Sequence, residues 1–120
     1  MSVSLSLPKT LSSDADRRAV TDTIAGLSAA WPIERIVLFG SKARGDDDPE
    51  SDIDLLVITT DEVTPDDEAA MNDVAWNAGI AHGKVVQLVI RSHDRWWHGI
   101  DQATPLRLQI DQDGIEVYCR

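Results

Sequence analysis

Residues Ile36–Ile58 read IVLFGSKARGDDDPESDIDLLVI, and this segment carries most of the information about the architecture of the chain. An apolar run leads into a turn at Gly40–Ser41, and a second apolar run begins with Asp52 and Asp54. Alternate side chains of a β-strand point to the same side, so both carboxylates are expected to project from one face. Mg²⁺ usually binds through one or two carboxylates together with substrate phosphates. The spacing therefore predicts a metal-binding carboxylate pair beside a turn.

The turn itself has features of a phosphate site. A Gly-Ser turn that opens a helix offers backbone N–H groups and a hydroxyl to phosphate oxygens. Lys42 and Arg44 follow the turn, and either cation could contact phosphate. Other interpretations stay open at each position: Gly40 as a strand-ending residue with positive φ, Ser41 as a helix N-cap, and Arg44 in a surface salt bridge.

The length and net charge of the chain exclude some classes of protein and favour others. The chain has 120 residues, enough for one core and one domain. Its 21 acidic and 11 basic residues give a formal net charge of -10, which disfavours sequence-independent binding to nucleic acid. No apolar stretch approaches the roughly 18 residues of a membrane span, and the N-terminus lacks the pattern of a signal peptide. Cys119 is the only cysteine, so no internal disulfide can form and a cytoplasmic location is expected.

The apolar periodicity predicts an α/β (α+β) fold, with a small mixed sheet and helices packed on it. Residues 1–12 are expected to form a flexible N-terminal arm, and residues 13–120 a single domain. The expected helices span residues 14–30 and 65–81, and the expected strands span residues 35–39, 53–59, 85–90 and 115–118. Residues 104–110 fit a short helix and a strand equally well. Trp31 and Trp76 are expected to anchor the core or its edge.

The spacing of Gly40–Ser41, ten residues and then Asp52-Ile53-Asp54 resembles the minimal nucleotidyltransferases (MNT type) of the DNA polymerase β-like nucleotidyltransferase superfamily. The phrases LFGSKARG and SDIDLLV both match the pattern of that family, and each lies at the end of an apolar run. The resemblance covers about residues 14–118, including Ile110–Tyr118 as the closing helix and strand. It implies the polymerase β-like nucleotidyltransferase fold.

The resemblance also implies an activity. Members of the family transfer a nucleoside monophosphate, often AMP from ATP, to a hydroxyl while pyrophosphate leaves. Two Mg²⁺ ions would be held by Asp52 and Asp54, which are therefore the expected catalytic and metal-binding residues, with ATP as the substrate. Gly40 and Ser41 would hold the triphosphate, with Lys42 and Arg44 as further candidates for nucleotide and phosphate binding.

The chain departs from the family pattern at one position. Full catalytic sets in the superfamily use a third carboxylate from a neighbouring strand, and the residue that aligns with it here is Gln87. A glutamine carbonyl can ligate a metal weakly, but it takes no proton at pH 7. Loss of a general base costs on the order of 10²–10⁴ in rate. The enzyme could work with two acids, be slow, or have kept the fold without the reaction.

Family members of this size usually act with a separately encoded helical partner of the HEPN type in toxin–antitoxin pairs. The resemblance therefore implies AMP transfer to a HEPN-type toxin by an antitoxin. The alternative is a non-catalytic antitoxin or binding module that neutralises its partner by contact, as the substitution at Gln87 favours. Transfer to a small molecule such as an aminoglycoside is a related alternative, although those enzymes usually carry an additional helical domain. The third possibility is a small structural domain in which the motif occurs by chance.

Two further groups of polar residues are expected to be unrelated to the site. The acidic segment Asp46–Glu50 is expected to be a solvated loop, with docking of a basic partner as the alternative. His82, His93 and His98 lack the spacing of a metal-ligand cluster and are expected at the surface or partly packed.

Overall fold

A five-stranded mixed sheet organises the chain, which was studied as a computed structural model that describes residues 4–46 and 50–120. The sheet order is β1-β5-β2-β3-β4. The strands are β1 (Ser4–Leu5), β2 (Ile33–Phe39), β3 (Ile53–Thr59), β4 (Val86–Ser92) and β5 (Ile115–Cys119). The helices are α1 (Asp14–Ala30), α2 (Ser41–Arg44), α3 (Pro65–Ile80), α4 (His93–His98), the 3-10 helix η1 (Ile100–Ala103) and α5 (Pro105–Asp113).

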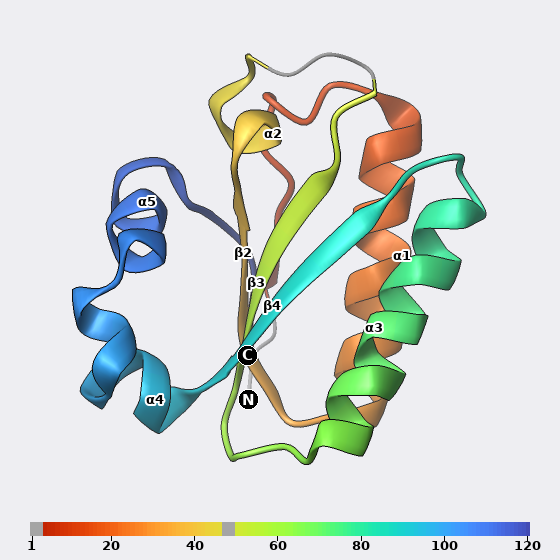
Figure 1. Ribbon diagram of the computed structural model, residues 1–120. Coiled ribbons are helices and arrows are strands. Elements are labelled where there is room, and N and C mark those ends of the chain that lie inside the picture. Colours follow the sequence, from red (N-terminus) through yellow and green to blue (C-terminus); the bar gives the residue numbers. More distant parts are fainter. Residues whose placement is uncertain (1–3, 47–49) are drawn as a thin grey trace.

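Helices cover both faces of the sheet, with α1 and α3 on one side and α4 and α5 on the other (Figure 1). The central strand β3 contributes to both layers, because Leu55 packs in the core cluster beneath α1 and α3, whereas Leu56 and Ile58 pack with Trp96 and Ile110. This arrangement confirms the α/β prediction of a mixed sheet with helices on it. It also explains why β3 is apolar on both faces.

Strand pairing brings the two segments quoted first into contact. Strand β2 pairs antiparallel with β3, and the register places Phe39 opposite Asp54. Strand β4 pairs parallel with β3, with α3 as the connection, and the register places Gln87 beside Asp54. The end of β2, the start of β3 and the start of β4 therefore meet at one edge of the sheet.

Local sequence signals account for where the helices begin. The Ser13 hydroxyl accepts a hydrogen bond from the Asp16 amide at the start of α1. Thr64 and Asp67 form a capping box at the start of α3, and Pro65 occupies the first turn. The Thr104 hydroxyl accepts a hydrogen bond from the Arg107 amide at the start of α5, which resolves the ambiguous segment in favour of a helix.

One expected core residue lies elsewhere. Trp76 is 54% exposed, so the prediction that it anchors the core or its edge is wrong. The buried side of α3 carries Met71 and Ala75, and a helix rotates about 100° per residue, which turns Trp76 away from that side. Trp31 is half-buried and packs against the core, as expected, with its indole N–H donating to Asp67.

The N-terminal segment contributes to the sheet and the core within its described part. Ser4–Leu5 pairs antiparallel with Tyr118–Cys119 of β5, and Leu11 is completely buried. The flexibility expected for residues 1–12 stays a prediction, and residues 1–3 of that arm lie outside the described residues. The expected acidic loop also falls partly outside them, at residues 47–49. No helix among the described residues is long and apolar enough to cross a bilayer.

Candidate active site

The carboxylate of Asp54 lies directly against the turn that follows β2. Gly40 has φ +78°, a conformation that residues with a side chain rarely adopt. A Cβ atom added at Gly40 would lie 2.6 Å from Oδ2 of Asp54. Glycine is therefore required here twice, by the backbone conformation and by the approach of the acid. The predicted turn and the predicted carboxylate pair are therefore in direct contact in the structure.

The charge of Asp52 acts on the carboxyl group of Asp54. Partial burial raises the pKa of the Asp54 carboxyl above its ordinary value, and the neighbouring charge of Asp52 raises the pKa further. Asp52 is exposed and precedes the first residue of β3, whereas Asp54 lies within the strand. Two like charges held this close favour the binding of a cation or a proton.

Gln87 completes the polar group from the neighbouring strand. Its Nε2 donates to Oδ2 of Asp52 at 2.7 Å, while its backbone lies in register with Asp54. The position at which a third carboxylate was expected is thus occupied by an amide that contacts one of the two acids. The side-chain role predicted for this position stays a prediction.

The donor set suits a hard divalent cation that shares its ligands with a bound phosphate chain. Asp52 and Asp54 offer carboxylate oxygens, and the mutual repulsion of their charges is relieved by a cation. Within the described residues no cluster of three or more His, Cys, Asp or Glu side chains could hold a metal alone. Mg²⁺ usually keeps ligands from water and substrate, so a two-carboxylate site fits it.

The turn and α2 present groups of the kind that bind phosphate. The hydrogen bonds of α2 begin with the Ala43 amide donating to the Gly40 carbonyl, so the Ser41 amide precedes the first intrahelical bond. Arg44 is exposed and pairs with Asp46 at 3.1 Å and with Asp113 at 3.7 Å. Exposed pairs of this kind contribute about 0–1 kcal/mol, so Arg44 can exchange partners at small cost.

Lys42 occupies a different environment from the one expected of a phosphate ligand. Its side chain is 1% exposed, and its Nζ lies 2.8 Å from Oδ2 of Asp16 at the start of α1. Lys84 approaches the other oxygen of Asp16 at 3.4 Å. The buried pair ties α2 to α1, and the phosphate contact expected of Lys42 does not fit this position.

Asp16 is the polar residue near the site that sequence reasoning missed. The segment Ser13-Asp14-Ala15-Asp16 resembles a capping box, with an acid three residues after the Ser. In the structure its carboxylate is buried against Lys42 instead, 26 residues away along the chain. No local pattern encodes such a pair, so only the fold reveals it.

The three histidines contact residues other than the carboxylate pair. His82 contacts Asp22 at 2.7 Å, and His93 contacts Glu34 at 2.5 Å. The ring of His98 lies 5.9 Å from that of His93. His82 and His93 thus join helices to neighbouring elements through carboxylate partners.

Comparison with known proteins places the chain among nucleotidyltransferases. The sequence profile of the family described as "Nucleotidyltransferase domain" matches residues 21–105. That range includes the Gly40–Ser41 turn, Asp52, Asp54 and Gln87. No curated protein shows significant similarity to the chain.

Several solved structures share the fold. A toxin–antitoxin complex with AMP-PNP superposes with a TM-score of 0.58 at 17% identity, covering 90% of this chain and 75% of that one. A Sulfolobus solfataricus protein assigned to the nucleotidyltransferases gives 0.56 at 18% identity, with 95% and 91% covered. A complex of a tri-AMPylated Shewanella oneidensis HEPN toxin with its MNT antitoxin gives 0.55 at 18% identity, with 88% and 73% covered. At these identities the likeness establishes the fold alone.

Proposed function

Because the chain belongs to the nucleotidyltransferase domain family, we propose that it transfers AMP from ATP to a hydroxyl group of another protein. The observation that carries the proposal is the contact between the Asp54 carboxylate and the Gly40 turn. A carboxyl group packed directly against a glycine turn has no evident structural purpose. It does have a chemical one if both sides hold a metal-bound triphosphate.

The roles of the residues follow from their positions. Asp52 and Asp54 would hold Mg²⁺, which when bound neutralises phosphate charge and stabilises the attacking and leaving oxygens. The Gly40–Ser41 turn would bind phosphate oxygens through its amides and the Ser41 hydroxyl. Arg44 would exchange its surface carboxylate partners for phosphate. Lys42 would act indirectly, by fixing α2 through Asp16.

The transfer step forms one bond and breaks another. The hydroxyl oxygen of the acceptor bonds to the α-phosphorus, and the bond from that phosphorus to the bridging oxygen breaks, releasing pyrophosphate. The hydroxyl proton passes to water, because the Gln87 amide accepts no proton at neutral pH. The reaction is therefore slower than in a site with three carboxylates, by on the order of 10²–10⁴.

The proposed acceptor is a HEPN-type toxin, with this chain as its antitoxin. The support is the shared fold with an MNT antitoxin bound to a tri-AMPylated HEPN toxin and with a toxin–antitoxin complex containing AMP-PNP. The acidic charge of this chain, -10, also favours a basic partner.

A second candidate function is neutralisation of the partner by contact alone. The observation that favours it is the 2.7 Å hydrogen bond from Gln87 to Asp52. An amide donor at this position stabilises the carboxylate without a metal, which a third acid could not do. In that case the fold persists as a binding surface and no nucleotide is transferred.

Labelled ATP separates the two candidates. The protein is incubated with Mg²⁺, a HEPN-type partner, and ATP labelled at either the α- or the γ-phosphate. If AMP is transferred, the partner protein becomes labelled by α-labelled ATP and not by γ-labelled ATP. The variants Asp52→Ala and Asp54→Ala should not label the partner. Asp61→Ala removes an exposed acid beyond the far end of β3 and serves as the control. Absence of α-label despite an intact complex would support the contact mechanism instead.

A further inference from the structure

Strand β4 leaves one edge of the sheet open, because the sheet order ends with it among the described residues. The Ile53 amide donates to the Val85 carbonyl at 2.9 Å, so the backbone groups of Val85 and of alternate residues after it point toward β3. Those of Val86, Leu88 and Ile90 consequently point to the open edge. The Ile90 carbonyl accepts a hydrogen bond from the Arg91 side chain, which is consistent with this orientation.

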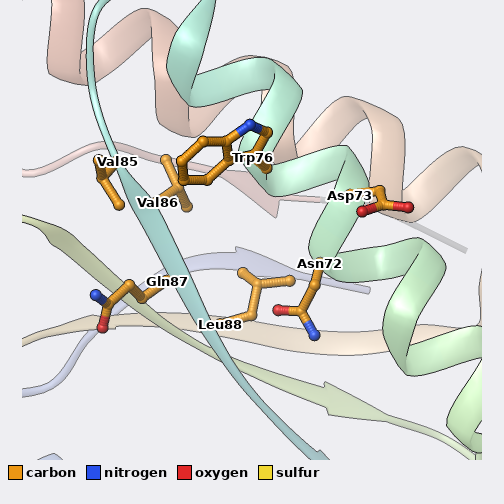
Figure 2. Close-up of a pocket in the computed structure, with 7 residues that line it drawn as sticks. All are labelled: Asn72, Asp73, Trp76, Val85, Val86, Gln87 and Leu88. Atoms are coloured by element: carbon orange, nitrogen blue, oxygen red, sulfur yellow. The ribbon is translucent and has the colours of Figure 1, made fainter.

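A groove runs along this edge beneath α3. A cavity of 520 Å³ is lined by Asn72, Asp73 and Trp76 of α3 and by Val86 and Leu88 of β4, among others. Figure 2 shows the side chains of Val86 and Leu88 directed toward α3, with Gln87 pointing to the other side of the strand. We call the surface formed by Asn72, Asp73, Trp76, Val86 and Leu88 the β4 groove.

The groove continues beyond this cavity. A second cavity of 270 Å³ shares Asn72 and Leu88 with the first and extends to Ile90 and Arg91. The open hollow therefore follows the direction of β4 over much of its length. That shape suits an extended chain better than a compact small molecule.

The chemistry of the groove indicates what kind of chain would bind there. Trp76 is 54% exposed and offers a large apolar surface at the groove wall. Helix α3 carries four acidic residues and no basic one: Asp66, Asp67, Glu68 and Asp73. A second copy of this chain would bring a net charge of -10 against that acidic helix, so self-association is disfavoured.

We infer that the open edge of β4 binds an extended, basic segment of a partner protein as an additional strand. Its backbone would exchange hydrogen bonds with Val86 and Leu88, and its apolar side chains would cover Trp76. Its basic side chains would face Asp73 and Glu68, the two acids of α3 that line the cavities. Strand addition supplies affinity through the main chain, while the groove supplies specificity. The inference does not depend on nucleotide transfer, since no part of it involves Asp52, Asp54 or the turn.

A peptide probe tests the inference on the full chain without Mg²⁺ or ATP. The probe is KKTVTVTVKK, and its controls are the acidic EETVTVTVEE and a form of KKTVTVTVKK with N-methylated alternate amides along one edge. Binding is followed by NMR of the isotope-labelled protein. We expect saturable shifts at the Val86 and Leu88 amides and the Trp76 indole, with slower hydrogen exchange at both amides.

The controls and variants separate strand addition from nonspecific attraction. N-methylation should weaken binding about tenfold, as should Trp76→Ala and Asp73→Lys. Leu108→Ala and Asp94→Lys alter exposed residues on α5 and α4 and should leave binding unchanged. Both Trp76 and Asp73 are exposed, so their variants are expected to fold.

Four outcomes would overturn the inference. They are no saturable binding of the basic peptide, equal binding of the acidic peptide, unchanged binding after N-methylation, and shifts confined to other surfaces. Shifts of the same amides that grow with protein concentration alone would assign the groove to self-association. Because the assay contains no nucleotide, failure here leaves the proposed transfer activity intact, and loss of transfer leaves this result intact.

Discussion

The amide of Gln87 donates to the carboxylate of Asp52 across 2.7 Å, joining the start of β4 to the residue that precedes β3. In parallel register Gln87 also lies beside Asp54. The side chain at position 87 thus reaches the same polar group as the two acids. This relationship makes position 87 the most informative site for substitution.

Gln87→Asp should increase AMP transfer, by up to about 10²–10⁴ if the new carboxylate accepts the hydroxyl proton. The measurement is the rate of α-label transfer to the partner at saturating Mg²⁺ and ATP. Gln87→Asn is the matched control, since it has the same length as aspartate but remains an amide, and it should give no gain. Equal rates for the two variants would show that this position does not supply the missing acid.

Gly40→Ala should destabilise the protein and abolish binding of Mg²⁺-ATP, because its Cβ would meet Asp54 Oδ2 at 2.6 Å. Gly83→Ala is the matched control, with a similar φ of +69° but no atom within 4 Å of the added Cβ. We expect Gly83→Ala to cost about 1 kcal/mol and Gly40→Ala about 1–3 kcal/mol more. Urea unfolding and nucleotide titration measure both effects. Equal costs would contradict the close approach of Asp54 to the turn.

Asp16→Ala should destabilise the protein by about 3–5 kcal/mol, because it leaves the ammonium of Lys42 buried without its 2.8 Å partner. The double variant Asp16→Ala/Lys42→Met removes both charges and should recover much of that loss. A double-mutant cycle in urea gives the coupling energy. If the loss of stability in the double variant equals the sum of the losses in Asp16→Ala and Lys42→Met, the two residues are not energetically coupled.

The stabilising effect of Asp67 should depend on pH in the acid range. Hydrogen bonds from the Thr64 backbone N–H, the Trp31 indole N–H and the Thr64 side chain hold the pKa of Asp67 below its ordinary value of 3.8. Its contribution is therefore fully present above pH 3.8 and is lost as the pH falls through the folded-state pKa.

Comparison of wild type with Asp67→Asn by thermal unfolding across this range tests that dependence. The wild type should have the higher Tm at pH 7, and the difference should shrink as the pH approaches and passes below 3.8. Asp66→Asn removes a charge from the same helical turn while leaving the capping box in place. A difference that stays constant down to acid pH would exclude the carboxylate as its cause.

The short-range features of this chain were predictable because they depend on neighbouring residues. The helix starts at Ser13 and Thr64 follow from side-chain capping, and β3 follows from the apolar run Leu55–Ile58. The spacing from Gly40 to Asp54 likewise predicted both a turn and a carboxylate pair. Each signal lies within a few residues or between two consecutive strands.

Tertiary structure alone decided which distant groups meet. The burial of Lys42 against Asp16, the exposure of Trp76 and the hydrogen bond from Gln87 to Asp52 each depend on how helices and strands pack. The local sequence pattern predicts on which side of its helix or strand a residue lies. It does not predict which side chains of the neighbouring helix or strand lie opposite that residue. The amino-acid sequence therefore determined α1, α3, the strands β2 to β5 and the carboxylate motif. The packing of the sheet determined their partners, and with them β1 and α4, which no local pattern predicted.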